Sequence, residues 1–512
     1  MFALLLIFFI LLGTSAILYA LTILETPAPD YPTIPIWQTL YDHARGITRA
    51  ESYNTRIRPI IERHGAVNLW HAGRWVVLAT RPDLVAQIFR QDDIFIKGGN
   101  IKKIPHSTFA RIFGVNIIDS HGALHTSFTE IIKPGIQRRF DLEPAKASSA
   151  QLAESLLREQ AQHPAKGVGI DHGIMEWAVR VFADSFLDLD AERVQVYFPR
   201  VVEAMDRFKD GVATRLQTLL YNIFPSLERL HWLLPSGHYG VRIADRLEDL
   251  IMELAELTDE DHANATRSRD NEQVIHRLRK AYRAGSITKY HYRCNLKQLF
   301  IAGVENIDIV LNSALWELGK NVALQRRLRH EVLTKLPGNY TESDLDELPL
   351  LTATVYETLR LYPPLINLIN RYTSEPVQFG SDTTHPLPKD TWVGWHSYGT
   401  HTDPCVWGTS AREFDPDRWG WDTVTIHNMF RGMQVKGKFF PFATHGRRCL
   451  ASKFALTQMK LALCELLRRV EWERDEDYNL SLVTGVLLGP RNCKLFFRER
   501  VKKELNEPSL DC

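Results

Sequence analysis

Residues 439–449 read FFPFATHGRRC and lead directly into residues 451–470, where apolar side chains recur at helical spacing. Cys449 is therefore expected at the start of a helix, where free backbone N–H groups and the positive end of the helix dipole favour a thiolate. Arg447 and Arg448 add positive charge. A cysteine in such a turn is either a nucleophile, which needs a histidine base, or a metal ligand. The remaining alternative is a buried structural cysteine.

Two segments upstream carry a second pattern. Glu357 and Arg360 are three residues apart in a predicted helix, which the sequence LYPP at residues 361–364 should end. Residues 414–419 read FDPDRW and supply another arginine, Arg418. Taken alone, Glu357 and Arg360 could form an ordinary exposed ion pair. Their order and distance relative to Cys449 make chance a poor explanation.

These segments resemble the cytochrome P450 family of haem-thiolate monooxygenases, and the resemblance runs over essentially the whole chain. The family's haem loop has the pattern F-x-x-G-x-R-x-C-x-G. This chain matches it at Phe442, Arg447 and Cys449. His445 and Ala451 occupy the two glycine positions, and we expect Gly446, next to His445, to keep the loop tight.

The resemblance implies a mainly α-helical fold with small β-sheets, and it assigns roles to individual residues. Haem b is the expected cofactor, with the thiolate of Cys449 as the axial ligand of its iron. Arg447 and Arg371 should hold the haem propionates by charge-assisted hydrogen bonds. Glu357, Arg360 and Arg418 should form the family's Glu-Arg-Arg cluster.

An early helix of the family usually carries a Trp and an Arg four residues apart as further propionate partners. In this chain His125 and Thr129 occupy those positions. His125 can still donate one hydrogen bond to a propionate. The alternative for His125 is a surface histidine with no such role.

Residues 299–306 read LFIAGVEN within a long apolar helix and resemble the family's central A-G-x-[DE]-T segment. Small residues at Ala302 and Gly303 would let a ligand on the haem approach the helix. Glu305 is expected to belong to a proton relay, because a carboxylate in an apolar run needs a partner or a function. The alternative is a salt-bridged acid at a helix edge. Asn306 replaces the usual Thr, and an amide can order a water but has no rotating hydroxyl.

Further segments narrow the resemblance to one fungal branch, which contains the yeast spore-wall dityrosine enzyme. They are the Glu-Asn pair at 305–306 and residues 97–105, 362–371 and 403–408. The implied reaction is oxidation or oxidative coupling of a tyrosine-derived phenol, N-acylated or carrying an isocyano group, in secondary metabolism. The segments expected to face the substrate are residues 98–115, 299–306, 365–370 and 484–488, which are largely apolar.

Three other interpretations of the function remain open. The chain could hydroxylate another apolar natural product, such as a terpenoid or polyketide. With Asn306 in place of Thr, it could be a haem-thiolate isomerase or dehydratase that does not activate dioxygen. A non-catalytic anchored binding protein would contain no haem. Dependence on both NADPH and dioxygen would distinguish hydroxylation from isomerisation or dehydration.

Composition excludes several classes of protein. The chain has 512 residues with 62 Lys plus Arg and 61 Asp plus Glu, a formal charge of +1, so nucleic acid is not an expected partner. At 45% hydrophobic and 24% charged residues it is a globular protein with a sizeable core. The six cysteines form no C-x-x-C pair, which excludes the usual zinc and iron–sulfur spacings.

Periodicity predicts a mostly helical body. Helices are expected over residues 151–160, 242–257, 296–321 and 451–470, and a β-hairpin over residues 66–70 and 75–80.

The N-terminus predicts a membrane anchor. Residues 1–24 contain no charged side chain and can cross a bilayer once as a helix; a cleaved signal peptide is the competing interpretation. Prolines at 27, 29, 32 and 35 suggest a stiff spacer over residues 25–36, followed by the catalytic domain at 37–512. The family's usual topology implies the endoplasmic reticulum with a cytosolic body. The sequons at Asn264, Asn339 and Asn479 should then stay bare.

Charge is concentrated around Cys449. Residues 423–464 contain no Asp or Glu. They contain Arg431, Lys436, Lys438, Arg447, Arg448, Lys453 and Lys460. With Arg447 engaged by a propionate, the other six predict a basic face that docks an acidic electron donor, an NADPH-dependent flavoprotein reductase. The alternatives are a solvated patch or contact with anionic lipid.

Overall fold

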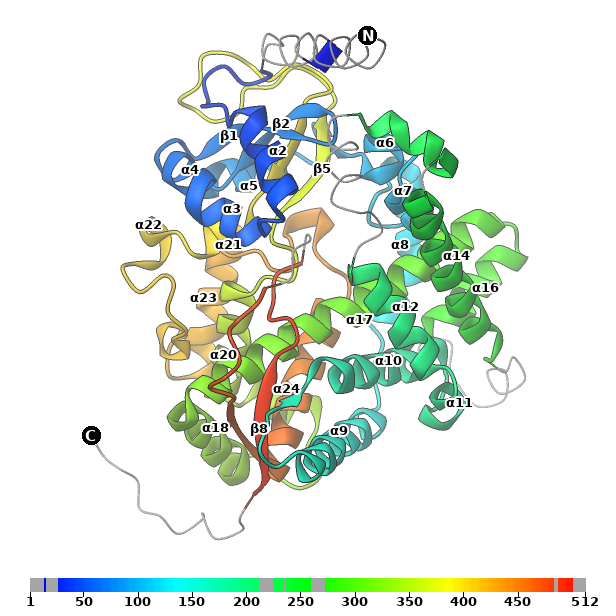
Figure 1. Cartoon of the computed structure of the whole chain (residues 1–512), viewed down its shortest axis with the longest axis vertical. Helices are drawn as coiled ribbons and strands as arrows, with labels where there is room; N and C mark the ends of the chain where they lie inside the picture. The colour runs from blue at the N-terminus through cyan, green and yellow to red at the C-terminus, as the bar shows by residue number, and fades with distance from the viewer. Residues whose placement is uncertain are drawn as a thin grey trace, which may run out of the picture.

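The computed structural model describes residues 13–14, 26–210, 224–233, 235–258, 272–482 and 487–500. Apart from residues 13–14, the expected anchor over residues 1–24 lies outside this part, as do Asn264 and residues 484–486. Helices dominate the described chain, and two small sheets accompany them (Figure 1). The expected mainly helical fold with small sheets is therefore confirmed.

The α-helices have the following bounds: α2 (Ile36–Arg45), α3 (Arg49–Ser52), α4 (Arg58–His64), α5 (Pro82–Arg90), α6 (Gly99–Lys103), α7 (Thr108–Phe113), α8 (Gly122–Ile136), α9 (Glu143–Gln162), α10 (Asp171–Leu187), α11 (Ala191–Gln195), α12 (Phe198–Asp210), α14 (Pro235–Glu256), α16 (Val274–Arg283), α17 (Lys289–Lys320), α18 (Val322–Lys335), α19 (Glu342–Asp346), α20 (Pro349–Leu361), α21 (Ser397–His401), α22 (Pro404–Trp407), α23 (Thr423–Val435) and α24 (Ser452–Arg469). Short 3-10 or π turns lie at η1 (Tyr53–Ile57), η2 (Pro225–Leu233), η4 (Pro416–Trp419) and η5 (His445–Arg447). The four helices expected from periodicity are confirmed as α9, α14, α17 and α24.

The larger sheet has the strand order β1-β2-β6-β5-β3. Its strands are β1 (Ala66–His71), β2 (Arg74–Ala79), β3 (Phe95–Lys97), β5 (Leu368–Thr373) and β6 (Trp392–Trp395). β1 and β2 form the predicted hairpin, whose two turn residues Ala72 and Gly73 have φ of 50° and 75°, as a tight hairpin turn requires. In β5 the pairing with β6 shifts between Ile369 and Arg371, so that a bulge sets the direction of the side chains there.

The smaller sheet has the order β4-β8-β7, from β4 (Val168–Gly169), β7 (Val470–Arg474) and β8 (Lys494–Glu499). β7 follows α24 without a loop. The smaller sheet lies at the end of the helical core that is farthest from the larger sheet (Figure 1).

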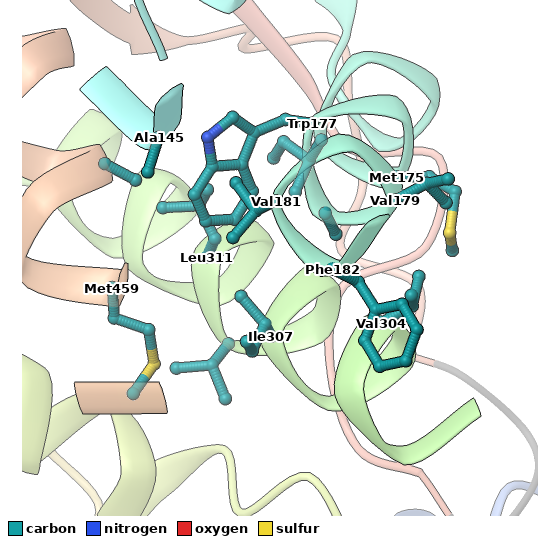
Figure 2. Close-up of a cluster of buried hydrophobic side chains, with 14 of the residues drawn as sticks. Ala145, Met175, Trp177, Val179, Val181, Phe182, Val304, Ile307, Leu311 and Met459 are labelled. Atoms are coloured by element: carbon teal, nitrogen blue, oxygen red, sulfur yellow. The ribbon is translucent and has the colours of Figure 1, made fainter. Parts of the chain in front are cut away.

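The helical core is centred on α17. Figure 2 shows Trp177, Val181 and Phe182 of α10 beside Val304, Ile307 and Leu311 of α17, with Met459 of α24 on the other side. A Cβ on Gly303 would come within 2.6 Å of the Phe182 ring, so the glycine allows these two helices to pack closely. α17 is also the one described helix long and apolar enough to cross a membrane, but 78% of that window is buried inside the protein.

The proline-rich residues lie against the body. Asn68 Nδ2 donates to the carbonyls of Ala28 and Tyr31 at 2.8 and 2.9 Å, and the Tyr31 hydroxyl donates to the Phe379 carbonyl at 2.9 Å. Ile34 N donates to the Asn68 carbonyl at 2.8 Å. Within the expected stiff spacer over residues 25–36, residues 28–34 are thus attached to the body by hydrogen bonds to Asn68 of β1 and to Phe379.

Candidate functional site

The loop before Cys449 is held by its own backbone. Cys449 N donates to the Phe442 carbonyl at 2.8 Å, and the Phe442 ring packs on the main hydrophobic core. His445 has φ of 55°, in the left-handed region, whereas Gly446 is not among the positive-φ glycines. The expectation that Gly446 keeps the loop tight is therefore wrong. His445 itself adopts the conformation that the family assigns to glycine, at a cost of roughly 1–2 kcal/mol.

Cys449 does not begin the helix. α24 starts at Ser452 with Ala451 as its N-cap, so the sulfur lies three residues earlier than expected. The side chain has accessible surface but lies deep enough that burial raises the pKa of Cys449. The Ala451 N–H and the charge of Arg448 lower this pKa, with less effect. The expected low-pKa thiolate is thus not a property of the protein alone; a metal ion would have to favour it.

The nucleophile interpretation of Cys449 gains no support from its surroundings. The groups that act on its pKa within the described chain are the Ala451 amide and Arg448, and no histidine is among them. A covalent mechanism would need a histidine hydrogen-bonded to the sulfur. Metal ligation is the remaining chemical role.

Glu357 lies at the centre of an ionic cluster in which Glu357 and Arg360 are fully buried and the Arg418 side chain is 9% exposed. Arg360 donates to it from Nε and Nη2 at 2.8 and 2.7 Å, and Arg418 donates from Nε at 2.9 Å. Trp419 Nε1 and the Asp415 backbone N–H donate to the same carboxylate at 3.0 and 2.9 Å. We call this group the Glu357 cluster. Every carboxylate oxygen is satisfied, which is the condition under which a buried ion pair is stable.

His401, which the sequence analysis did not single out, connects the Glu357 cluster to the cysteine loop. Its carbonyl accepts a hydrogen bond from Arg360 Nη1 at 2.8 Å, and its ring nitrogen Nε2 accepts one from the Phe440 backbone at 3.0 Å. Burial, with the nearby charge of Arg360, lowers the pKa of His401 to about 3. The ring is therefore neutral and serves as an acceptor.

Three cations gather near the cysteine loop, and one of them, Arg447, belongs to the loop itself. Lys97 of β3 lies directly opposite Arg371 of β5 in the antiparallel pair, an arrangement in which like charges repel. Arg371 is completely buried, and Arg447 Nη2 donates to the Ser120 carbonyl at 2.5 Å. We call Lys97, Arg371 and Arg447 the Arg371 cluster.

Asp92 is the acid nearest to the Arg371 cluster. It bonds to Arg371 Nη1 and lies 3.4 Å from Arg447 Nε. Burial and the charges of Arg371 and Arg447 lower the pKa of Lys97 well below its usual value. Within the described residues, two carboxylates, those of half-exposed Asp92 and partly buried Asp119, thus face the three cations.

His125 of α8 lies near the same cluster. Burial lowers its pKa to about 4, and the charges of Arg447 and Lys97 contribute to this shift. Its Nε2 lies 3.5 Å from the Thr129 hydroxyl, and that hydroxyl donates to the His125 carbonyl at 2.8 Å. The structure thus brings together Arg371, Arg447 and His125 from the sequence prediction and adds Lys97.

These residues fit a haem. Arg371 Nε and Nη2 are buried and have no hydrogen-bond partner among the described residues, and such guanidinium nitrogens require an acceptor. Two propionates would supply acceptors and negative charge at the Arg371 cluster. Within the described residues, no group of three or more His, Cys, Asp or Glu could hold a metal. Cys449 would therefore be one ligand to a metal whose other ligands come from a cofactor, as in a porphyrin.

The oxygen-side segment lies in the middle of α17. Asn306 Nδ2 donates to the Ala302 carbonyl one turn earlier, at 3.0 Å. Leu299, Ala302, Gly303 and Asn306 form one partly exposed helix face, whereas Glu305 is 4% exposed. Glu305 therefore lies in the core, and its role in a proton relay stays a prediction. Gly303 faces Phe182, so its size serves helix packing.

The basic face is smaller than expected. Lys460 is 2% exposed and bonds to Asp346 at 2.8 Å, so it belongs to the interior. Lys453 is exposed but paired with Glu342 at 3.0 Å. The remaining cations at the surface are Arg431, Lys436, Lys438 and Arg448, which is the set that we call the basic face. Lys453 and Lys460 were both expected to be free surface cations. They are paired because α19, which is distant in sequence, places Glu342 and Asp346 against α24.

Comparisons with known proteins agree with this geometry. Residues 32–497 match the family described as Cytochrome P450. The chain is 38% identical over 458 residues to the cytochrome P450 monooxygenase xanG of Aspergillus fumigatus, which covers 89% of this chain and 84% of that protein. It is 29% identical over 493 residues to cytochrome P450-DIT2 of Saccharomyces cerevisiae, covering 92% and 93%. The solved structure of the cytochrome P450DA haem domain shares the fold, with a TM-score of 0.70 at 18% identity, over 92% of this chain and 98% of that one.

Proposed function

The chain belongs to the cytochrome P450 family and is a monooxygenase of that family, and we propose that it oxidises or oxidatively couples a tyrosine-derived phenol in fungal secondary metabolism. The 38% identity to xanG over most of both chains and the similarity to DIT2 carry the monooxygenase assignment. The tyrosine-derived substrate rests on the resemblance of residues 97–105, 305–306, 362–371 and 403–408 to one fungal branch. The proposed substrate is N-acylated or carries an isocyano group.

Cys449 is the proposed axial ligand of haem b. When bound, the haem supplies dioxygen activation, which a thiolate ligand favours. Phe442 supports the loop from the core side and keeps Cys449 in place through its carbonyl. Arg371, Arg447, Lys97 and His125 are the proposed propionate partners. Lys97 lies where it can compensate for the absence of the Trp–Arg pair on α8, because the β3–β5 ladder fixes it opposite Arg371.

Glu305 and Asn306 are the proposed proton-handling residues. The amide nitrogen of Asn306 is engaged by the Ala302 carbonyl, which leaves Oδ1 as an acceptor that can orient a water. Glu305, buried one residue earlier, can hold the proton that this water carries onward. The Glu357 cluster, in contrast, is proposed to be structural: Glu357, Arg360 and Arg418 keep the cysteine loop in register through His401.

Electrons are proposed to come from NADPH through a flavoprotein reductase that docks on the basic face. Arg431 and Arg448 both act on the pKa of buried Tyr356 in α20, which supports placing both arginines around that residue. The end of α8 joins this surface, because Gln137 Nε2 donates to the Leu450 carbonyl at 3.4 Å. Arg448 belongs to the cysteine loop itself, which supports docking of the reductase at this loop.

A single N-terminal anchor over residues 1–24, with the body facing the cytosol from the endoplasmic reticulum, completes the proposal. The uncharged apolar composition of those residues supports it. Detergent dependence of the full chain, compared with a chain beginning at residue 26, tests this part. A chain that is equally soluble in both forms would contradict it.

The decisive experiment supplies the purified holoenzyme with reductase, NADPH, dioxygen and N-formyl-L-tyrosine. The proposal predicts an oxidised or coupled phenol whose formation requires both NADPH and dioxygen. Conversion of a terpenoid or polyketide panel in place of the tyrosine compound would favour hydroxylation of another natural product. Turnover without NADPH and dioxygen, as expected of the isomerase or dehydratase that Asn306 suggested, would contradict the monooxygenase assignment.

A further inference from the structure

A second group of basic side chains meets at the edge of the larger sheet. Lys103, at the end of α6, donates from Nζ to the Ile369 carbonyl at 2.7 Å. Arg74 in β2 donates from Nη2 to the Lys103 carbonyl at 2.7 Å. His71 lies directly opposite Arg74 in the hairpin. α6, β1, β2 and β5 all lie in the upper part of Figure 1.

Arg49 joins this group from α3. Its Nη1 donates to Asn367 Oδ1 at 3.0 Å, and this is the one side-chain hydrogen bond that it makes within the described residues. Asn367 directly precedes β5, to which Lys103 also bonds. Arg49 and His71 are partly exposed, so the group is neither sealed nor fully solvated. We call Arg49, His71, Arg74 and Lys103 the Arg49 cluster.

The Arg49 cluster has little negative charge to balance it. Burial lowers the pKa of His71 well below its usual value, and the next causes are the charges of Lys103, Arg49, His43 and Arg74. Burial also lowers the pKa of Lys103 to about 8. Partly buried cations of this kind are costly unless an anion joins them.

In the part of the chain that the structure describes, two acids lie close enough to be considered. Asp42, near His43, is already engaged by Arg56 at 2.8 Å. Asp119 acts on Lys103 but faces Lys97 as well, and burial raises the pKa of Asp119. Neither is dedicated to the Arg49 cluster, which therefore retains donors and positive charge for a ligand.

The Arg49 cluster lies close to the proposed haem site. Asn367 and Arg371 are four residues apart along the chain at β5, which places them on the order of 13 Å apart. Asp119 interacts electrostatically with Lys97 of one cluster and with Lys103 of the other. The residues from 365 to 370 are also those expected to face the substrate. A molecule that extends along β5 can therefore contact both regions.

We propose that the Arg49 cluster is a subsite for the carboxylate of the substrate, with Arg49 and Lys103 as its direct hydrogen-bond donors. The substrate class is thus an acid, and for a tyrosine-derived compound the group is the α-carboxylate. This inference rests on the proposed function. Recognition involves binding only: charge-assisted hydrogen bonds orient the molecule so that its other end reaches the haem side.

The test compares acids with their amides. The holoenzyme is titrated with N-formyl-L-tyrosine and N-formyl-L-tyrosinamide, and binding is followed by the Soret absorption and by calorimetry. The wild type should bind the acid at least about tenfold more tightly than the amide. Arg49→Gln and Lys103→Met should each bring the ratio close to one, whereas Arg49→Lys should retain part of the preference. Arg63→Gln, at an exposed arginine of α4, is the matched control and should leave the ratio unchanged.

A second pair of probes, octanoate and octanamide, separates this inference from the proposed function. If octanoate is preferred through Arg49 and neither tyrosine compound binds, the carboxylate subsite stands and the tyrosine-derived substrate is wrong. If neither acid is preferred over its amide, the subsite is wrong whatever the enzyme converts. Loss of haem in an Arg49 variant would also count against it, because that result assigns Arg49 to the protein's own structure.

Discussion

The backbone N–H of Phe440 donates a hydrogen bond to Nε2 of His401, 3.0 Å away. This bond joins the cysteine loop to the Glu357 cluster, since the carbonyl of the same histidine accepts from Arg360. An ionic cluster distant from the sulfur can therefore control the loop that positions it.

His401 should make stability depend on pH. Burial lowers its pKa from 6.5 to about 3 in the folded protein, so below pH 6.5 the unfolded chain binds a proton that the folded chain does not. The free energy of unfolding should thus fall with pH from 6.5 towards 3, with a contribution from this residue of about 1.4 kcal/mol per pH unit. Urea unfolding of wild type and His401→Gln at several pH values measures it. Equal slopes for the two proteins would refute this assignment.

Glu357→Gln should destabilise the fold strongly, because it leaves Arg360 and Arg418 buried without their shared carboxylate. The expected loss is about 3–5 kcal/mol in the free energy of unfolding. Glu342→Gln removes the partly buried partner of exposed Lys453 and serves as the control, with an expected loss of up to about 1 kcal/mol. Similar losses in both variants would show that the Glu357 cluster has no special structural role.

Lys97→Met should weaken haem retention without weakening the fold. The substitution removes a propionate partner but also relieves the repulsion with Arg371 across the β3–β5 ladder. Haem transfer to apomyoglobin should become roughly tenfold faster, a loss typical of one charge-assisted hydrogen bond. Lys133→Met, at an exposed site on α8, is the control. Unchanged haem transfer together with a less stable fold would mean that Lys97 is structural.

Reversing charge on the basic face should slow reduction. The double variant Lys436→Glu, Lys438→Glu should reduce the rate of electron transfer from the reductase about tenfold at low ionic strength, with an unchanged haem spectrum. Salt should remove the difference. Arg158→Glu, Lys166→Glu makes the same change of charge at exposed residues of α9 and the following loop. An equal effect of the two double variants, seen by stopped-flow absorption, would locate docking elsewhere.

Local patterns predicted much of the fold and of the site. The β1–β2 hairpin and α9, α14, α17 and α24 follow from periodicity and turn residues, which depend on neighbours in sequence. The motif around Glu357 and Arg360 could be recognised for the same reason. The start of α24 was predicted at Cys449 but lies at Ser452. The N-cap at Ala451 and the 3-10 turn at residues 445–447 determine this position, and apolar periodicity does not reveal them.

Contacts between distant segments could not be predicted. Lys97 reaches Arg371 through the pairing of β3 with β5, and Arg49 reaches Asn367 across more than three hundred residues. Lys460 looked exposed because its partner Asp346 lies on another helix. The segment at residues 365–370 looked apolar, and only its polar contacts with Arg49 and Lys103 reveal the charged group beside it.

The ligand role of Cys449 is the central claim, and the absorption spectrum of the Cys449→Ser variant tests it most directly. In the reduced, carbon monoxide-bound protein, the wild type should show the red-shifted Soret band of thiolate ligation. The Ser variant should lose that band and its NADPH-dependent turnover while it keeps its fold. A variant that retains both the band and the turnover would contradict the account.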